Sequence, residues 1–427
     1  MTSMTPVTCY VYGGGMPSPC QIPEPLAVVV AGPAGSGKST LGRALAAELR
    51  APLVDLDSVT TPLLEALPAD ALGGHWLSSR HAGVIRAGRY AALRATAADA
   101  LSTAGRVVVV APFTAELTGG DDWQALRDAL FPTEPVVLHV DGDPEILASR
   151  RVARGAARDA YRVDVPPVAP AVPVVAVDAE LTTGQQLARA LPALGIRRPL
   201  DAGATIFARE FDAVLFDLDG TLVDSTASVA RSWRRFAEHF DVSMEALHAN
   251  HGQPARTLVS LLLPTDRHAE ALTHVTDLEV ADAVGLAPIR GAAAFFASVP
   301  ADRRAIVTSG SVPIATARLA AAGYDQPDVF VTVDDVVHGK PDPEPFLLAA
   351  TRLGVDPSRC LVVEDAPAGI AAARAAGCAV IALTGTTADE ELHADLVVDG
   401  LDAVGLEIMA SGALRLRPTR ASRMPVG

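Results

Sequence analysis

Two aspartates separated by one residue, Asp217 and Asp219, have the type and spacing that phosphate chemistry requires. They follow the apolar run Ala213–Phe216, so we expect them at the end of a buried strand, where α/β sheets bind their ligands. One carboxylate can attack phosphorus as a nucleophile, while the other protonates the leaving alcohol and later deprotonates water. The pattern therefore predicts Asp217 as nucleophile and Asp219 as acid and base, with Gly220 allowing a tight turn.

A second group of residues is suited to holding a phosphoryl group. Thr308, Ser309 and Gly310 follow the strand-like segment Arg304–Val307 and offer hydroxyls and adjacent backbone amides. Lys340 supplies a cation that offsets the negative charge shared by a nucleophile and a phosphate. These residues are predicted to bind the substrate's phosphate beside the paired aspartates.

A further pair of carboxylates, Glu364 and Asp365, ends another apolar run. Hard oxygen ligands of this kind would hold Mg²⁺ together with Asp217 and the main-chain carbonyl of Asp219. Each residue taken singly has a simpler explanation, because aspartates cap helices and lysines are usually solvated surface charges. The combination of all the segments favours a catalytic site.

These segments resemble, in order and at the expected intervals, the four motifs of the haloacid dehalogenase superfamily. The resemblance covers residues 210–415 and implies a Rossmann-like sheet and an aspartyl-phosphate on Asp217. The dehalogenases of the family lack the second carboxylate, so Asp219 implies phosphoryl transfer. The implied roles are nucleophile Asp217, acid and base Asp219, phosphate ligand Thr308, charge-balancing Lys340, and metal ligands Asp217, Asp219, Glu364 and Asp365, with Glu364 acting through water.

The mostly helical insertion at about residues 225–288 resembles the family's cap, which closes over the site and favours small substrates. Within it, the segment His251–Thr257 is similar to the substrate-facing segment of the sugar and polyol phosphatases. His251 and Arg256 are therefore candidates for substrate recognition. The alternative is that both are ordinary residues of the cap surface.

A glycine-rich segment, Gly32–Thr40, lies between a valine strand and a predicted helix. Its spacing matches the phosphate loop, in which glycines let backbone amides face a phosphate and the helix N-terminus favours anions. ATP is the predicted ligand, with the lysine bridging the β and γ phosphates and Ser39 reaching Mg²⁺. The residues assigned to the nucleotide are Gly32, Gly35, Ser36, Gly37, Lys38, Ser39 and Thr40.

The first half of the chain also resembles the small P-loop kinases of the gluconate kinase and chloramphenicol phosphotransferase type. That resemblance makes Asp57 the acid that activates an acceptor hydroxyl, although an Asp at this place is also a common helix N-cap. Arg150 and Arg154 resemble the arginines of the kinase lid, but a solvated basic helix face explains them equally well. The strand Arg106–Ala111 ends without an acid, which favours a kinase over a mechanical ATPase.

The elements that carry these motifs alternate between strand and helix through both halves of the 427 residues. We therefore predict an α/β protein of two domains, each a parallel sheet between helices. The net charge of −15 argues against a nucleic-acid partner. No signal peptide or membrane span is recognisable, so a cytoplasmic location is expected. The predicted regions are a disordered tail 1–24, a P-loop domain 25–192, a linker 193–209, a phosphatase domain 210–415 and a basic tail 416–427.

The preferred hypothesis is a bifunctional enzyme, in which a kinase-like domain binds ATP and a phosphatase domain hydrolyses a sugar or polyol phosphate. Polynucleotide kinase-phosphatases join the same two domain types, so nucleic-acid end repair is an alternative. A third hypothesis makes the first domain a nucleotide-binding regulator of the phosphatase. The oligomeric state and the substrate of either domain are not predicted.

Overall fold

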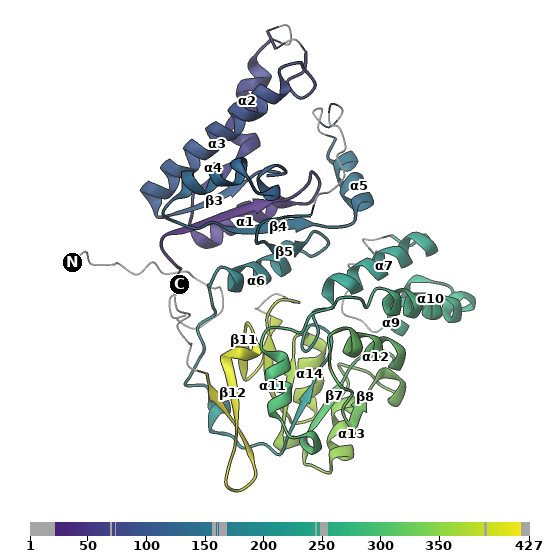
Figure 1. Cartoon of the computed structure of the whole chain (residues 1–427). Coiled ribbons are helices and arrows are strands. Elements are labelled where there is room, and N and C mark those ends of the chain that lie inside the picture. Colours follow the sequence, from purple (N-terminus) through teal and green to yellow (C-terminus); the bar gives the residue numbers. More distant parts are fainter. Residues whose placement is uncertain are drawn as a thin grey trace, which may run out of the picture. The chain divides into compact units, whose positions relative to one another are not determined.

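The structure is a computed structural model of the whole chain (Figure 1). It describes residues 22–68, 71–72, 74–155, 159, 161, 169–243, 246–247, 255–387 and 391–419. Most of the predicted N-terminal tail and the end of the predicted C-terminal tail lie outside these residues. The chain divides after Arg197 into two compact units.

The first unit is built on a five-stranded parallel sheet with the order β2-β3-β1-β4-β5. The central strand β1 is a continuous apolar run, because both of its faces are covered. Val28 and Val30 pack with Leu45 of α1, whereas Val29 packs with Leu93 of α3 on the opposite face. The strands are β1 (Leu26–Ala31), β2 (Leu53–Asp55), β3 (Arg106–Val110), β4 (Val136–Asp141) and β5 (Val175–Asp178); the helices are α1 (Lys38–Leu49), α2 (Leu56–Ala66), α3 (Ala82–Ala104), α4 (Asp121–Leu130), α5 (Pro144–Arg154) and α6 (Thr183–Ala193).

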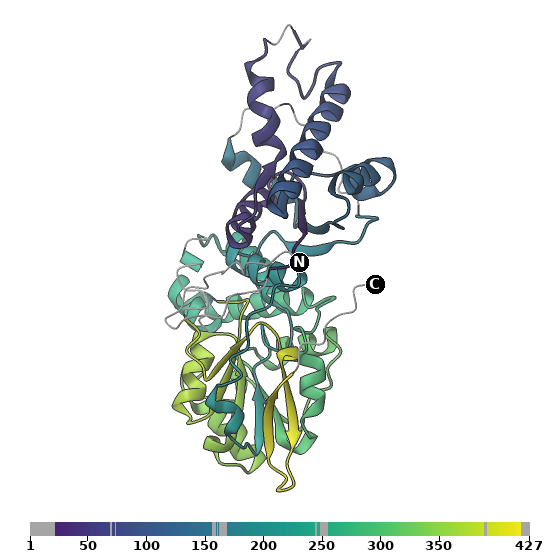
Figure 2. The ribbon, with the colours of Figure 1, turned by 90° about the vertical axis from the view of Figure 1, so that its left-hand side faces the viewer.

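The second unit has a six-stranded parallel sheet with the order β11-β10-β9-β6-β7-β8. Helices cover both faces, as Figure 2 shows: Phe295 and Leu319 belong to the core on one face, and Phe346 and Ile370 to the core on the other. The strands are β6 (Ala213–Phe216), β7 (Arg304–Val307), β8 (Val329–Val331), β9 (Cys360–Glu364), β10 (Ala379–Leu383) and β11 (Leu396–Val398); the helices are α11 (Ala292–Ser298), α12 (Val312–Ala321), α13 (Glu344–Leu353) and α14 (Pro367–Ala375).

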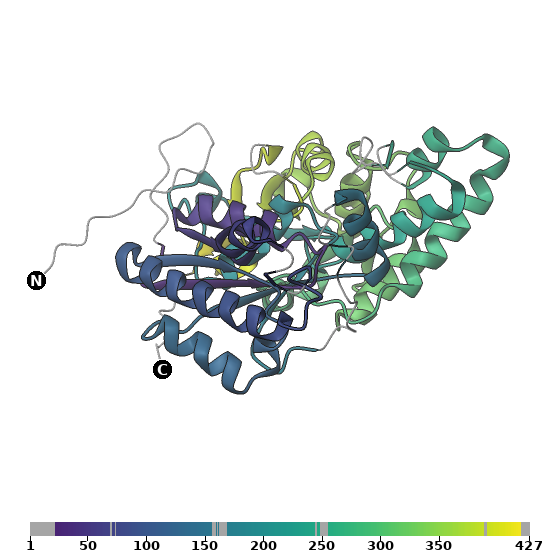
Figure 3. The same ribbon diagram turned by 90° about the horizontal axis from the view of Figure 1, so that it is seen from above.

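A helical cap is inserted between β6 and β7 in the second unit. Its described helices are α7 (Thr226–Phe240), α9 (Ala255–Leu262) and α10 (His268–Ala281), and α7 and α10 lie side by side (Figure 3). They share a small core of their own that includes Phe236, Val259 and Val275. The predicted α/β fold, with two helix-covered parallel sheets and a helical cap, is confirmed.

The end of the second unit differs from the prediction. Two antiparallel strands, β12 (Val404–Ile408) and β13 (Leu414–Pro418), form a hairpin there. Leu414 and Leu416 of β13 are buried in one of the main cores. The hairpin therefore includes residues 416–418, which lie beyond the predicted domain boundary at residue 415. No described helix is long and apolar enough to cross a membrane.

Candidate active site

The predicted site residues of the second unit come together at the carboxyl ends of its central strands. β6 lies between β7 and β9 in the sheet. Asp217 follows β6, Thr308 follows β7, and Glu364 is the last residue of β9. Parallel strands end at the same edge of a sheet, so segments far apart in sequence meet there.

Lys340 connects three of these strand ends. Its ammonium nitrogen lies 2.6 Å from Asp217 Oδ1, 2.7 Å from Glu364 Oε1 and 2.9 Å from the carbonyl oxygen of Val307. Its residue surface is only 5% exposed, so the alternative of a solvated surface lysine is wrong. Burial would lower the pKa of Lys340, but the charges of Asp217 and Glu364 outweigh it and raise the pKa. The side chain is thus held as a cation against Asp217.

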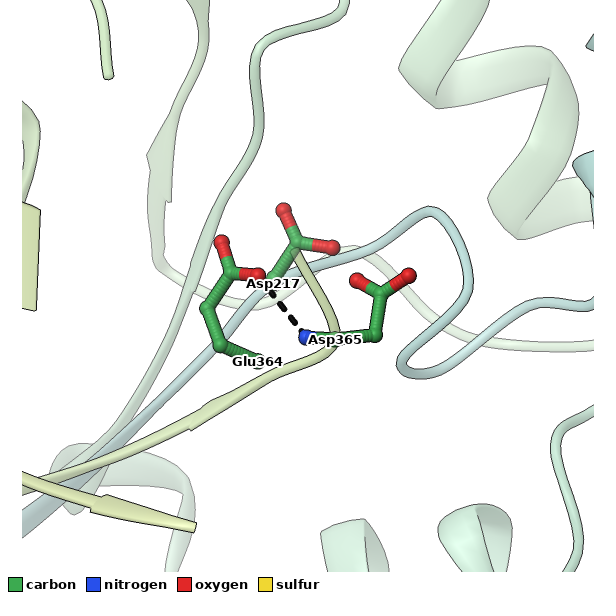
Figure 4. A group of neighbouring side chains, drawn as sticks. All are labelled: Asp217, Glu364 and Asp365. Carbon is green, nitrogen blue, oxygen red and sulfur yellow. Dashed lines mark hydrogen bonds between the residues drawn. The ribbon is translucent and has the colours of Figure 1, made fainter. Parts of the chain in front are cut away.

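The two carboxylates at the end of β9 have different hydrogen-bond partners. Glu364 Oε2 accepts hydrogen bonds from the backbone amides of Asp365, at 2.8 Å, and Ala366, at 2.9 Å, while Oε1 faces Lys340. Asp365 Oδ1 accepts a hydrogen bond from the Thr221 hydroxyl at 3.1 Å, whereas its buried Oδ2 has no hydrogen-bond partner among the described residues. Figure 4 shows Asp217, Glu364 and Asp365 converging on one small space.

The charge of this cluster suits a divalent cation. Oxygens of Asp217, Glu364 and Asp365 lie within 4.8 Å of one another, and all three residues are buried. Three carboxylates and one ammonium leave two negative charges without compensation. Burial, together with the neighbouring carboxylates, raises the pKa of Asp217 to about 7 and the pKa of Asp365 well above its usual range. The free oxygen of Asp365 and this excess charge both fit a Mg²⁺ ion.

Gly220 makes the close approach of these segments feasible. Its φ of 81° lies in the left-handed region, which favours glycine. A Cβ at this position would come within 2.1 Å of Asp365 Oδ2. The turn after Asp219 therefore passes directly against the candidate metal ligand.

The carboxylate of Asp219 is held by two side chains that the sequence did not point to. Its Oδ1 accepts a hydrogen bond from the Ser225 hydroxyl at 2.6 Å, and its Oδ2 lies 2.7 Å from Arg318 Nη1. The other arm of that guanidinium, Nη2, lies 2.7 Å from Glu279 Oε2. Ser225 stands six residues from the aspartate, but Arg318 and Glu279 lie within helices and belong to no motif.

The segment after β7 has the geometry expected of a phosphate-binding turn. Thr308 is buried, and its hydroxyl accepts a hydrogen bond from the Gly310 amide at 3.0 Å. Its own amide donates to Val331 of the neighbouring strand. Ser309, between Thr308 and Gly310 in the sequence, is exposed. The assignment of Thr308, Ser309 and Gly310 to phosphate binding stays a prediction.

The predicted cap residues are only partly covered by the structure. Arg256 is the second residue of α9, its side chain is 69% exposed, and its Nη2 lies 3.6 Å from Asp334 Oδ1. Asp334 belongs to the sheet domain below the cap, so Arg256 reaches across to it. His251 lies outside the described residues.

The glycine-rich segment of the first unit forms a loop between β1 and α1. Gly32, Gly35 and Gly37 have φ values of 143°, 90° and 88°. A Cβ on Gly32 would come within 2.2 Å of the carbonyl oxygen of Val140. Lys38 begins α1, and its ammonium nitrogen lies 3.3 Å from the carbonyl of Pro33 within the loop. This is the strand, loop and helix context that the phosphate-loop prediction requires.

The remaining loop residues lie at the start of α1 and just before it, and their assignment to the nucleotide stays a prediction. Ser39 and Thr40 lie in the first turn of α1, where the amide of Thr40 donates to Gly37 at 2.8 Å. Ser36 is fully buried, and its hydroxyl has no hydrogen-bond partner among the described residues. The loop thus contains one buried polar group that the described residues leave unsatisfied.

Asp57 is not the N-cap of the helix that follows. That place belongs to Asp55, whose Oδ1 accepts from the amides of Asp57, at 2.9 Å, and Ser58, at 3.4 Å. Asp57 lies in the first turn of α2, and its Oδ1 accepts a hydrogen bond from Arg89 Nη2 at 2.7 Å. The capping alternative is therefore wrong, and Asp57 instead carries an ion pair with α3.

Three arginines of α5 make different contacts, and the assignment of Arg150 and Arg154 to the nucleotide stays a prediction. Arg150 donates to the carbonyl of Ala179 at 2.8 Å, and Arg154 pairs with Asp159 at 2.6 Å. It is Arg151 that donates to the carbonyl of Ala34 inside the phosphate loop, at 3.1 Å. Arg150 and Arg154 are four residues apart and therefore lie on one face of the helix. Arg151, which contacts the loop, lies on a neighbouring face and was not included in the prediction.

Comparison of the sequence with known proteins identifies the family of the second unit. A family model of haloacid dehalogenase-like hydrolases matches residues 211–377. Hexitol phosphatase A of Escherichia coli K12 is 40% identical over 208 residues, which are 46% of this chain and 95% of that protein. The chain belongs to the haloacid dehalogenase-like hydrolases. The predicted resemblance of the second half to this family is confirmed.

One further hydrolase and one solved structure are also similar to this chain. Glycerol-1-phosphate phosphohydrolase 1 of Saccharomyces cerevisiae is 32% identical over 219 residues, which cover 46% of this hydrolase and 84% of the yeast protein. The crystal structure of CbbY from Rhodobacter sphaeroides in complex with phosphate is 26% identical, with a TM-score of 0.40, and the match covers 44% of this chain and 94% of that one.

A different family model accounts for the first unit. It is described as an AAA domain and matches residues 28–166, which include the phosphate loop and α5. The predicted resemblance of this half to P-loop proteins is confirmed. The hydrolase therefore carries a P-loop domain in addition to its phosphatase-like domain.

Proposed function

We propose that the second unit is a phosphatase that hydrolyses a small sugar or polyol phosphate through an aspartyl-phosphate on Asp217. The observation that carries this proposal is the buried contact of Lys340 with Asp217 and Glu364 beside the free oxygen of Asp365. A fixed cation against a carboxylate lowers the repulsion that an anionic phosphate meets on approaching the nucleophile.

The reaction needs two displacements. In the first, a carboxylate oxygen of Asp217 bonds to phosphorus, the bond from phosphorus to the ester oxygen breaks, and Asp219 gives its proton to the departing alcohol. In the second, water attacks phosphorus, its proton passes to Asp219, and the bond from phosphorus to Asp217 breaks. Inorganic phosphate leaves, and both carboxyl groups return to their starting states.

The residues at this site fit Mg²⁺, with Asp217, Asp365 and the Asp219 carbonyl as the ligands we propose. When bound, the ion would supply positive charge to the transferring phosphoryl group. Glu364 has both oxygens engaged by Lys340 and backbone amides, so we assign it to positioning Lys340 and to contact with the ion through water.

The substrate class is inferred from the cap and from the relatives. A helical cap is inserted between β6 and β7, and caps that close over a site favour small substrates. The similar proteins named above are a hexitol phosphatase and a glycerol-1-phosphate phosphohydrolase. We propose a linear polyol or sugar phosphate, with Ser309, Gly310, His251 and Arg256 as candidate contacts. No nucleic acid is expected as substrate.

For the first unit we propose ATP binding at the phosphate loop and transfer of phosphate to a small hydroxyl acceptor, with Asp57 as the activating acid. The loop geometry supports the nucleotide site, and the position of Asp57 after β2 supports the acceptor site. Arg151 is added to the candidate contacts of the nucleotide because it lies against the loop.

One observation favours a second candidate function for this unit. Asp57 is already paired with Arg89 at 2.7 Å, so a structural contact with α3 accounts for its place without an acceptor hydroxyl. The alternative is a nucleotide-binding domain that regulates the phosphatase without transferring phosphate.

The phosphatase is tested with glycerol 1-phosphate and a hexitol phosphate as substrates. We expect Mg²⁺-dependent release of inorganic phosphate, abolished by EDTA and by Asp217→Asn. Full activity in EDTA would contradict the metal assignment, and full activity of Asp217→Asn would contradict the nucleophile.

The kinase is tested in the Asp217→Asn chain, so that the phosphatase cannot remove the product. We expect ATP consumption that depends on an added sugar or polyol and that is lost in Lys38→Ala. ATP binding without consumption that depends on an acceptor would favour the regulatory function.

A further inference from the structure

The acid and base of the proposed reaction is connected to the cap through a single buried arginine. Arg318 belongs to α12, which covers the sheet, whereas Glu279 belongs to α10 of the cap. One arm of the guanidinium holds Asp219 Oδ2 and the other holds Glu279 Oε2, each at 2.7 Å. The guanidinium therefore bridges the catalytic carboxylate and a cap carboxylate.

The arginine and the cap carboxylate of this bridge are well shielded from water, while the side chain of Asp219 is 27% exposed. The side chains of Arg318 and Glu279 are 3% and 8% exposed. Burial raises the pKa of Glu279, although the charge of Arg318 opposes that effect. For Arg318, burial would lower the pKa, but Asp219 and Glu279 outweigh it. Removing one member of such a group leaves a buried charge without a partner, so its members are energetically interdependent.

The guanidinium has no further hydrogen-bond partner among the described residues. Its Nε is buried and has no hydrogen-bond partner among the described residues. Its two terminal nitrogens are directed at the two carboxylates, in the forked geometry that an arginine can provide and a lysine cannot. The Trp233 side chain of α7 acts on Glu279 in the same direction as Arg318 and lowers its pKa, so both long cap helices take part.

We propose that Arg318 is a positioning residue for Asp219, and that Glu279 fixes Arg318 from the cap, so that the orientation of the acid depends on the seating of the cap. This inference rests on the phosphatase function proposed above. It assigns to α10 a contribution to proton transfer in addition to covering the substrate. Trp233, Glu279 and Arg318 form a chain that ends at the catalytic carboxylate.

The test compares two substrates whose leaving groups differ in their need for a proton. A polyol phosphate releases an alkoxide, which needs the proton of Asp219, whereas 4-nitrophenyl phosphate releases a stabilised phenolate, which does not. The quantity measured is kcat/KM with Mg²⁺ present, because it reports the first displacement, in which the leaving group departs. A purely structural defect would lower both values by the same factor.

For Arg318→Met we expect kcat/KM to fall by about 100-fold with the polyol phosphate, the lower end of what general acid catalysis contributes. The expected loss with 4-nitrophenyl phosphate is less than about five-fold, because the nucleophile and Lys340 are untouched. Arg318→Lys keeps the charge without the fork, so it should recover part of the loss. Equal losses with both substrates would overturn the proposal.

Glu279→Gln tests the cap side of the chain and keeps the size of the side chain. We expect a smaller loss with the same preference for the polyol phosphate. The double variant Arg318→Met/Glu279→Gln should lose no more than Arg318→Met alone, because both changes act through one path. Additive losses would show that Glu279 does not act through Arg318 and would overturn the coupling to the cap.

The chain offers matched controls for both substitutions. Glu270→Gln changes an exposed acid of the same helix α10, and Arg352→Met removes a surface ion pair with Asp335. Both controls should keep the activity of the unchanged chain with both substrates.

If Arg318→Met fails to fold, as judged by circular dichroism, Glu279→Gln carries the test. An unchanged chain that hydrolyses neither substrate would contradict the proposed function itself, which separates the two failures.

Discussion

Burying Asp217, Glu364 and Asp365 within reach of one another has an energetic cost that Lys340 only partly offsets. Ionised carboxylates in a buried site repel one another, so the metal-free protein lowers the cost by retaining protons. That is the physical meaning of the raised pKa values of Asp217 and Asp365. A bound divalent cation would reverse the preference and stabilise the ionised forms.

A dependence of stability on pH follows from this cluster. The pKa of Asp217 is raised from 3.8 to about 7, so the native state binds more protons than the unfolded state within that range. The associated stability is fully present below the unfolded pKa and is lost as the pH rises through about 7. In EDTA, we expect the melting temperature to fall as the pH is raised from about 5 to about 8, because the cluster loses the protons it binds in the native state.

Added Mg²⁺ should therefore raise the melting temperature more at about pH 8 than at about pH 5, because fewer protons must be displaced. The measurement is thermal unfolding with and without Mg²⁺ at both pH values. Asp365→Asn serves as the comparison, because it removes one charge and one proposed ligand and should reduce both effects. An equal Mg²⁺ shift in the variant and the unchanged chain would contradict the assignment of Asp365.

At the scale of elements, the turn after β6 limits how near its backbone can come to Asp365. Gly220 has a φ of 81°, and a Cβ there would meet Asp365 Oδ2 at 2.1 Å. We expect Gly220→Ala to weaken Mg²⁺ binding and to lower phosphatase kcat/KM by at least about ten-fold, because Asp365 must move away. Mg²⁺ titration and steady-state kinetics measure both effects.

Gly323 provides a control for the backbone conformation alone. Its φ is 74°, but a Cβ there would meet nothing within 4 Å. Gly323→Ala should cost about 1 kcal/mol of stability from the left-handed conformation and leave the activity intact. Comparable losses of activity in the two variants would attribute the effect to general strain and not to Asp365.

The sequence predicted those parts of the site that lie at the ends of strands. Asp217, Thr308, Glu364 and Asp365 each follow a short apolar run, and the parallel sheet brings such positions together. The contact of Lys340 with Asp217 was expected from the motif it belongs to. These predictions needed only local patterns and the topology of the sheet.

Contacts made by residues inside helices could not be predicted in the same way. Arg318 and Glu279 lie in α12 and α10, where a charged residue normally indicates a solvated face. Only the packing of the cap on the sheet domain buries them together. The same holds for Arg151, because which arginine of α5 meets the phosphate loop depends on the rotation of the helix.

At the scale of the whole molecule, the two units have separate hydrophobic cores. Each of the described core clusters lies wholly within one unit: two belong to the first unit and three to the second. Each sheet also carries its own candidate ligand site. Cooperative unfolding follows the extent of a shared core, so we expect the units to unfold as separate transitions.

Differential scanning calorimetry of the full chain can assign those transitions. A ligand that binds only the native state stabilises it by about 2.7 kcal/mol at 100 times its Kd. Mg²⁺ with a non-hydrolysable ATP analogue should therefore raise one transition, and Lys38→Ala should abolish that shift. Mg²⁺ with beryllium fluoride, which mimics a phosphoryl group on a carboxylate, should raise the other, and Asp217→Asn should abolish that second shift. A single transition that responds to both ligands would show instead that the nucleotide site and the phosphatase site are thermodynamically coupled, as the regulatory alternative for the first unit requires.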